Sequence, residues 1–490
     1  MAKSSFTVLL AIALALVVCL NVYMLHQANR TEANYFIVNP NSPSSLNKPV
    51  TLPPGWVSVE SATSPDQWKA DYISRFNRQP PENYTRWITY AEKNHCPTAL
   101  DPYLQIYLDL DPWFKLGRIH PESIWPVAQY KVTVFNGSEF HGQYPRNFKL
   151  VDLFQDTKPF TFAINGPSGK PYDYDEPRII RSDDPMDVFP YKDMNDIFLR
   201  SECFRKRFDT PSPNDTFLLR KGQKLRDLHG FFMQPASFVV DNFRAPILSQ
   251  TKLDCFDDIL APLSYHTEIA TTPVNDVIKW EEKQNAVFWR GTTTGGVYRQ
   301  GAPWRKYPRT MLAKWAKDYE TKHPKSKFDT GKGERSPTNV KFGVDVALMG
   351  IVQHDEVVKA AIMKEFELKS RVSFLDTMKY KYLLVVDGNS WPSRLQSYLQ
   401  TNSVILYNGI FTDFYNRQLV PMVHYVPIKA DFSDLEEKLN WLVKNDGKAR
   451  EIAENGKALL KRVSEYRYLQ CYTGLMLMEY QRLYGVSRVV

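Results

Sequence analysis

The chain has 490 residues, 43% of them hydrophobic and 24% charged, which is enough for a large core and favours two or three domains. Its net charge of +8 arises from 62 Lys and Arg mixed along the chain with 54 Asp and Glu. Nucleic-acid-binding proteins more often concentrate basic residues in one stripe, so the pattern argues against nucleic acid as a partner and leaves anionic small molecules.

The N-terminus carries one long apolar segment, residues 6–24, shortly after Lys3. At ~1.5 Å per residue such a segment spans the ~30 Å hydrocarbon core of a bilayer. A cleaved signal peptide is the alternative, but its apolar region usually has only about 7–15 residues. We therefore expect a short cytoplasmic tail (1–5), a transmembrane signal anchor (6–24) and a stem rich in Pro, Ser and Asn (25–65), with the remaining chain on the lumenal side of the membrane.

Two further features fit a lumenal body. Asn-x-Ser/Thr sequences, the acceptor pattern for N-glycosylation, occur at Asn29, Asn83, Asn136 and Asn214. Outside the apolar segment the chain has an even number of cysteines, namely Cys96, Cys203, Cys255 and Cys471. In an oxidising compartment these predict two disulfides in one of three pairings, although four buried free thiols are the alternative. No Cys or Cys/His cluster indicates zinc.

Hydrophobic spacing then predicts the elements in chain order. Helical spacing surrounds Trp68 and Trp87, and residues 160–165 are strand-like. Strands and helices alternate from about 285 to 430: strands at 285–291, 380–388, 403–408 and 423–429, and helices at 308–320, 355–368 and 392–401. Residues 323–339 are predicted to be a basic loop, and helices follow from 434 onward. The alternation indicates a parallel sheet with crossover helices.

One polar turn follows the predicted strand 380–388 and carries Gly388, Asn389, Ser390 and Arg394. Pro392 suits the first position of a helix, whose unpaired N–H groups and dipole attract phosphate. Arg394 adds a permanently charged contact within the first turn of that helix. Alternatively, Ser390 only caps the helix and Arg394 pairs with an acidic residue.

A second polar turn follows the strand at 285–291 and carries Arg290, Gly291, Thr292 and Thr293. Its glycines permit close backbone approach, and its hydroxyl and N–H groups can surround an anion. The turn is not a Walker A loop, because the Gly-Lys-Ser/Thr ending is missing. Two arginine-bearing turns in one doubly wound region predict a cleft that binds a diphosphate.

Several segments resemble glycosyltransferase family 90: "HGFFMQP", "FDDILAPLSYH", "WEEKQNAVFWRGTTTGG" and "YKYLLVVDGNSWPSRLQSYLQTNSVILYNGIFTDFYNRQLVPMVHYVPIKADFSDL". The family includes fungal capsule-associated xylosyltransferases and animal Rumi-type protein O-glucosyltransferases. The resemblance runs from about 100 to 475 and is closest to the fungal branch.

The resemblance implies an α/β fold of the GT-B type, in which two Rossmann-like domains face a cleft. The acceptor-side domain would occupy 66–262 and the UDP-sugar-binding domain 263–433, with helices at 434–490 crossing back to the first domain. It also implies inverting transfer from a UDP-sugar without an essential metal or other cofactor, and it assigns Arg290 and Arg394 to the diphosphate.

Inversion requires a base that deprotonates the acceptor hydroxyl, and a carboxylate ionised at lumenal pH suits this role. The family's base lies in an Asp-x-Pro turn after a strand, which here corresponds to Asp175, with Asp173 as a competitor. Alternatively, Asp175 only starts a turn before Pro177. The pair Asp109 and Asp111 has the spacing of a metal-binding motif, but alternating acids are common, and no metal site is expected.

These observations predict a single-pass type II enzyme of the Golgi, or of the endoplasmic reticulum, that transfers a sugar to a glycan or glycoprotein hydroxyl. Xylose is the first choice because the fungal branch is closest. Transfer of glucose to a protein serine is the alternative within the same class. A catalytically inactive, sugar-binding lumenal protein is the alternative from another class.

Overall fold

The computed structural model describes residues 64–484 except for 117–130, 136–138, 142–143, 145–147, 155–159, 166–177, 181–238, 242–245, 253–257, 296–297, 303, 389–390, 410 and 430. The predicted anchor at 6–24 and both candidate bases, Asp173 and Asp175, lie outside the described residues. So do two residues of the predicted diphosphate site, Asn389 and Ser390.

The described chain begins with helices, as the spacing predicted. They are α2 (Pro65–Phe76), α3 (Tyr84–Lys93) and α4 (Leu104–Leu116). A capping box starts α2, because Ser64 and Gln67 each bond the other's backbone N–H. Trp68 and Trp87 are fully buried where these helices meet the rest of the N-terminal half.

A mixed sheet forms the N-terminal half, in the order β2-β1-β3-β6-β8. Its strands are β1 (Lys131–Phe135), β2 (Phe140–His141), β3 (Phe160–Asn165), β6 (Ile247–Ser249) and β8 (Ile259–Leu260). Strand β1 is antiparallel to β2 and β3, whereas β3, β6 and β8 run parallel. Two short pairs complete the strands: β4 (Arg178–Ile180) with β5 (Val239–Asp241), and β7 (Thr251–Lys252) with β13 (Thr412–Asp413).

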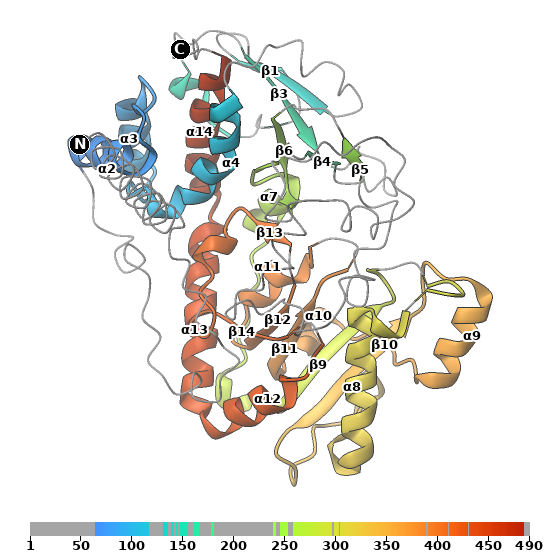
Figure 1. Ribbon diagram of the computed structural model, residues 1–490. Coiled ribbons are helices and arrows are strands. Elements are labelled where there is room, and N and C mark those ends of the chain that lie inside the picture. Colours follow the sequence, from blue (N-terminus) through green and yellow to red (C-terminus); the bar gives the residue numbers. More distant parts are fainter. Residues whose placement is uncertain are drawn as a thin grey trace, which may run out of the picture.

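The C-terminal half is built on a fully parallel sheet in the order β10-β9-β11-β12-β14 (Figure 1). Its strands are β9 (Gln284–Thr292), β10 (Gly343–Gly350), β11 (Tyr380–Val386), β12 (Val404–Asn408) and β14 (Val426–Pro427). The helices are α7 (Ser264–Thr271), α8 (Pro308–Lys322), α9 (Glu356–Glu365), α10 (Phe374–Thr377), α11 (Arg394–Leu399), α12 (Leu435–Lys444), α13 (Asp446–Val463) and α14 (Tyr466–Gln481). The predicted parallel α/β architecture is confirmed, although β10 was not predicted.

Both faces of this sheet are buried, as is usual for parallel sheets. Along β9, Phe288 packs into one hydrophobic core, while Val287 and Trp289 pack into a second core on the other face. The strand sequences are therefore almost continuously apolar, and polar side chains are concentrated where strands end.

Helix α14 crosses back to the N-terminal half, where it lies beside α3 and α4 (Figure 1). The indole N–H of Trp87 donates to the carbonyl of Cys471 at 3.0 Å. A disulfide joins Cys471 to Cys96, which is one of the predicted pairings. The other two cysteines of that prediction, Cys203 and Cys255, lie outside the described residues.

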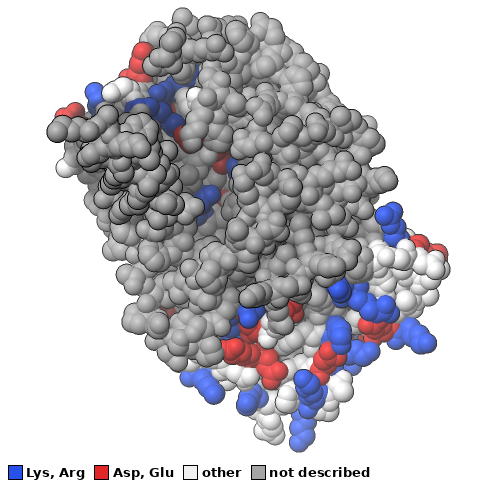
Figure 2. Space-filling view, viewed as in Figure 1, with Lys and Arg blue, Asp and Glu red and all other residues white. Residues whose placement is uncertain are grey.

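The visible charged surface of the described residues mixes both signs. In Figure 2, Lys and Arg alternate with Asp and Glu over the C-terminal half. No helix within the described ranges has both the length and the apolar character needed to cross a membrane.

Removing the disulfide should destabilise the fold, because it ties α14 to a segment 375 residues away in the chain. We expect Cys96→Ser with Cys471→Ser to lower the free energy of unfolding by about 2–5 kcal/mol, the usual range for a native disulfide. Denaturant unfolding of the oxidised protein and the double variant measures the difference. Equal midpoints would show that the bond does not contribute.

Candidate functional site

The carboxyl ends of β9 and β11 mark the point where the strand order reverses. From β9 the chain passes first to β10 on one side and later to β11 on the other. In open α/β sheets, the crevice outside such a switch point is the usual ligand site. Thr292 and Val386 are the last residues of these two strands, so the turns that follow them lie at this switch point.

Arg309 bridges the two strand ends. It lies in the first turn of α8, which begins at Pro308, and its side chain is buried. Its Nε donates to the carbonyl of Asp387 and its Nη1 to the carbonyl of Thr292, each at 3.0 Å. The guanidinium therefore links the end of β9 to the turn after β11.

Arg394 approaches the same place from α11. It is half-buried, and its Nη1 donates to the backbone carbonyl of Arg290 at 2.6 Å. Neither Arg309 nor Arg394 forms an ion pair with a carboxylate of any described residue. Burial, followed by the nearby charge of Arg394, lowers the pKa of Arg309 to about 9. Two neighbouring cations thus lie at the switch point without an ion pair to a described carboxylate, although the charge of the nearby Asp387 partly opposes the lowering of the pKa of Arg309.

Gly388 is part of this site because a side chain would not fit there. A Cβ would lie 2.8 Å from Nη2 of Arg309 and 2.9 Å from Oγ1 of Thr294. The glycine lets the turn after β11 approach both of these groups. Of the residues predicted for donor binding, Gly388 and Arg394 therefore lie at the switch point.

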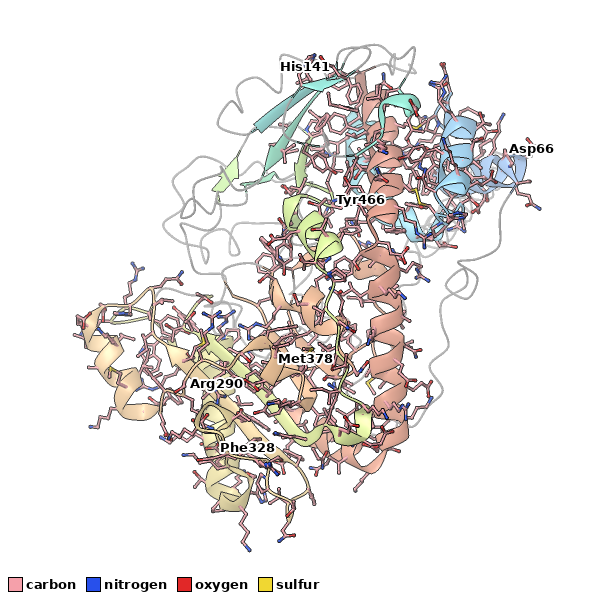
Figure 3. All side chains as sticks on the ribbon, turned by 180° about the vertical axis from the view of Figure 1, so that it is seen from behind. Asp66, His141, Arg290, Phe328, Met378 and Tyr466 are labelled. Carbon is pink, nitrogen blue, oxygen red and sulfur yellow. A yellow bond between two sulfur atoms is a disulfide. The ribbon has the colours of Figure 1, made fainter. Side chains whose placement is uncertain are left out.

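Arg290 does not point into the crevice, and the predicted convergence of its guanidinium with that of Arg394 is wrong. Its Nη2 lies 2.5 Å from Oδ1 of Asp345 and 3.0 Å from Oδ1 of Asp329. The reason is that β9 continues to Thr292, so Arg290 is still within the strand and its side chain projects from one face of the sheet, where Asp345 and Asp329 hold it. In Figure 3, Arg290 lies within the C-terminal half. Only its backbone carbonyl takes part in the site, as the acceptor for Arg394.

The carboxylate that holds Arg290 is the centre of a buried polar network. Asp345 also accepts from Lys369 Nζ at 3.1 Å and from the Tyr380 hydroxyl at 2.7 Å. Burial by itself raises the pKa of Asp345, but Arg290 and Lys369 outweigh it, so the pKa lies below the ordinary value of 3.8. The network is therefore structural and remains ionised at neutral pH.

The other predicted donor-binding residues have local structural roles. Gly291 leaves room for the ring of Trp289, which would lie 2.5 Å from a Cβ. The hydroxyl of Thr293 exchanges hydrogen bonds with the backbone of Val352, and Thr292 contributes its carbonyl to Arg309. Helix α11 begins at Arg394 rather than at the predicted Pro392 and has only six residues, so its dipole contributes little.

The first acid of the Asp-Leu-Asp sequence is also structural. Asp109 lies in α4 and forms a buried ion pair with Lys252 at 2.5 Å, while its other oxygen accepts from the backbone N–H of Leu260 at 2.8 Å. Within the part of the chain that the structure describes, no group of three or more His, Cys, Asp or Glu side chains could hold a metal ion.

Comparison with known proteins finds a match in the C-terminal region of the chain. The model of glycosyl transferase family 90 matches residues 266–489. The match confirms the resemblance indicated by the sequence motifs, over a shorter region than the 100–475 expected.

Three curated relatives illustrate the similarity. Protein O-glucosyltransferase 2 of Danio rerio is 29% identical over 205 residues, which cover 42% of this chain and 34% of the relative. Human protein O-glucosyltransferase 1 is 33% identical over 120 residues, which cover 24% of this chain and 31% of the relative. Human protein O-glucosyltransferase 3 is 33% identical over 118 residues, which cover 24% of this chain and 23% of the relative. The matches span about a third or less of the length of these relatives.

Sequence reasoning missed Arg309 and Thr294. One signal was present for Arg309, which follows Pro308 in the first turn of a predicted helix. A cation there opposes the helix dipole and is unfavourable unless something else requires it. Thr294 gave no comparable signal, because its position depends on how closely Gly388 approaches it.

Replacing Arg290 distinguishes its structural role from the predicted one. We expect Arg290→Ala to lower the free energy of unfolding by about 3–5 kcal/mol, because it leaves the buried Asp345 without its closest cation. Folded variant protein should keep its affinity for a diphosphate-containing ligand. Chemical denaturation together with calorimetric titration of UDP checks both statements, and a stable variant that has lost UDP binding would contradict them.

Proposed function

We propose that this protein is a glycosyltransferase that uses a UDP-sugar, and that Arg309 and Arg394 hold the donor's diphosphate. The observation that carries the proposal is the pair of neighbouring guanidinium groups at the switch point, with no carboxylate ion pair among the described residues. The family match over residues 266–489 supports glycosyl transfer as the reaction class.

A diphosphate suits this pair for electrostatic reasons. Desolvating a cation without a counter-charge is unfavourable, so an anionic ligand between Arg309 and Arg394 would stabilise both. When the sugar leaves, negative charge develops on UDP, and preorganised cations stabilise it most effectively where water is excluded. The two arginines supply this stabilisation from the chain itself, so the proposal includes no essential metal.

Glucose, transferred to a protein hydroxyl, is the proposed reaction. The relatives that match are named protein O-glucosyltransferases, which favours the serine-glucosylating alternative over the xylose transfer first expected. The proposal retains inversion at the transferred carbon, with Asp175 as the base and Asp173 as its competitor, and the GT-B arrangement of the two halves. A carboxylate is suited to deprotonating the acceptor hydroxyl.

The proposed compartment is the lumen of the secretory pathway. The Cys96–Cys471 disulfide is typical of an oxidising environment, and Asn83 offers a glycosylation acceptor at the start of α3. Neither the relatives' names nor the described residues support the Golgi or a type II anchor in particular.

Arg394→Ala tests the diphosphate site. The side chain makes one hydrogen bond within the described protein, so its loss should leave the fold intact while removing a charge-assisted contact worth about 1.5–3 kcal/mol. We expect KM for the UDP-sugar to rise about 10–100-fold in steady-state assays. Arg305→Ala, which removes an exposed arginine paired with Glu365, is the matched control. An unchanged KM in Arg394→Ala would place the diphosphate elsewhere.

A donor comparison tests the reaction itself. We expect kcat/KM for UDP-glucose to exceed that for UDP-xylose by at least about tenfold, because small differences in a sugar pocket are worth about 1–3 kcal/mol. Release of UDP in the presence of a serine-containing acceptor is the measurement. Faster turnover with UDP-xylose would favour xylose transfer instead. UDP binding without turnover of either donor would indicate an inactive sugar-binding protein.

A further inference from the structure

Helix α9 presents an apolar stripe to solvent at the outer edge of the C-terminal half. The helix follows β10, the edge strand of the parallel sheet, and Figure 1 shows it at the outer end of that half. The stripe consists of Val357, Ala360 and Met363. Val357 is 60% exposed and Met363 is 58% exposed, and Ala360, midway between them, is exposed as well. Among the described helices of eight or more residues, α9 alone carries exposed large apolar side chains.

The stripe is not needed to attach α9 to the protein. Val358 and Ile362, on the inward face of the helix, are buried in the hydrophobic core and hold it there. Other helices show the usual outward face, on which charged side chains pair along the helix, as Lys314 does with Asp318 in α8. Single exposed apolar residues are ordinary, whereas a contiguous apolar patch indicates an interaction surface.

The charges of α9 make this surface complementary to itself. Glu356 lies in the first turn of the helix and Lys364 in the last. At about 100° per residue, these two charges and the stripe fall within an arc of about 120° that is centred on Ala360. Two copies of α9 that pack antiparallel, about an axis near Ala360, therefore bring Glu356 of each copy to Lys364 of the other. The apolar side chains then meet between the two charge pairs.

Both charged groups are free to make such a contact. Lys364 is exposed and forms no ion pair with a described carboxylate. Glu356 is exposed and bonds only the neighbouring Lys359 of its own helix, at 3.2 Å, among the described cations of the helix. A carboxylate can accept several hydrogen bonds, so it can accept a second cation. Antiparallel packing also places the negative end of one helix dipole beside the positive end of the other.

We propose that α9 is a self-association surface and that its occupant is α9 of a second copy of this chain, packed antiparallel. This inference does not depend on the proposed function. A lipid surface or an unrelated apolar partner would not require an acidic group at one end of the stripe and a basic group at the other. The small side chain of Ala360 lets the two helices approach closely at the axis.

The size of the surface sets the strength of the association. Helix α9 has 10 residues and is therefore only about 15 Å long. A pair of such helices buries less than the ~1,200–2,000 Å² of a stable interface, so the dimer is weak, with a Kd above about 1 µM. The surface thus predicts a protein that is monomeric when dilute and that dimerises on concentration.

A cysteine at the axis tests the arrangement. Two cysteines bridge only when their Cα atoms come within about 7 Å, so we expect the full chain with Ala360→Cys to form at least about fivefold more disulfide-linked dimer than wild type under mild oxidation. Val277→Cys, at an apolar position outside α9 that is 75% exposed, is the matched control and should bridge no more than wild type. Equal bridging by the two variants, or none by either, would overturn the proposal.

Charge reversal tests the contact between the copies. Glu356→Lys or Lys364→Glu alone sets like charges against each other and should raise the Kd of the dimer about tenfold. The double variant restores complementary pairs and should return the Kd to within about threefold of wild type. Sedimentation equilibrium of the full chain measures the Kd, and Tm shows that each variant is folded. Single variants that associate like wild type, a double variant as weak as the single ones, or a wild-type chain that stays monomeric would each contradict the proposal.

Discussion

The site depends on one guanidinium group that joins two strand ends. Arg309 donates to the carbonyls of Thr292 and Asp387 and so fixes the distance between the turn after β9 and the turn after β11. The rigid fork of the arginine reaches the two carbonyls from two different nitrogens, whereas a lysine would offer a single charged nitrogen. No described carboxylate forms an ion pair with this guanidinium, which lies buried at the carboxyl edge of the sheet.

Arg290, unlike Arg309, is paired with buried carboxylates. Arg290 is neutralised by Asp345 and Asp329 inside the C-terminal half, and Lys369 joins the same network. The backbone carbonyl of Arg290, which any residue at this position would supply, accepts from Arg394. Arg290 is thus neutralised by ion pairs, whereas Arg309 and Arg394 at the sheet edge form no ion pair with a described carboxylate.

Much of the fold could be predicted from the sequence. Apolar residues that repeat every two positions indicate strands, and those that repeat every three to four positions indicate helices. Strand β10 was missed because Asp345 interrupts an apolar run that follows a loop rich in Gly, Ser and Pro. The candidate site was harder to predict from the sequence. Arg290 was assigned to the crevice because the strand was expected to end one residue after it, yet β9 continues to Thr292. Arg309 lies close to the crevice only because of how α8 packs, and the sequence around a single residue does not encode that.

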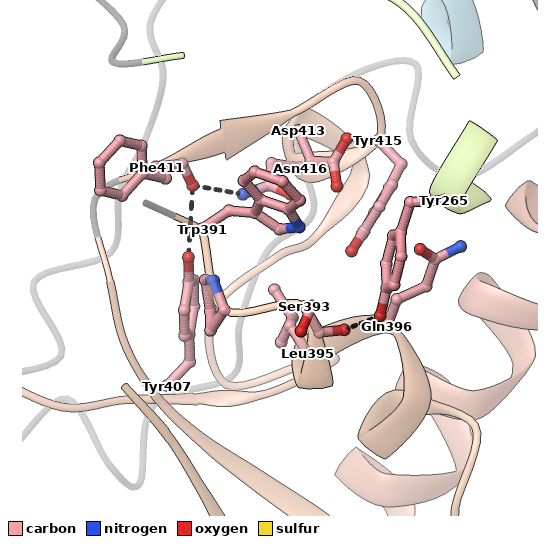
Figure 4. Close-up of a pocket in the computed structure, with 11 residues that line it drawn as sticks. Tyr265, Trp391, Ser393, Leu395, Gln396, Tyr407, Phe411, Asp413, Tyr415 and Asn416 are labelled. Atoms are coloured by element: carbon pink, nitrogen blue, oxygen red, sulfur yellow. Dashed lines mark hydrogen bonds between the residues drawn. The ribbon is translucent and has the colours of Figure 1, made fainter. Parts of the chain in front are cut away.

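The six residues of α11 contribute to the switch point and to a narrow pocket walled mostly by aromatic rings (Figure 4). Arg394, at its start, reaches β9, while Gln396, two residues later, lines the aromatic pocket beside Tyr265. Since these residues share one short helix, the side chains of Arg394 and Gln396 are held in a fixed relation to each other. The pocket wall also includes Asp413 in β13. Strand β13 pairs with β7, and the Asp413 carboxylate bonds His266 in α7. Neither β7 nor α7 is part of the parallel sheet. A shift of these segments against the sheet would therefore change the shape of the aromatic pocket while leaving the contacts of Arg309 unchanged.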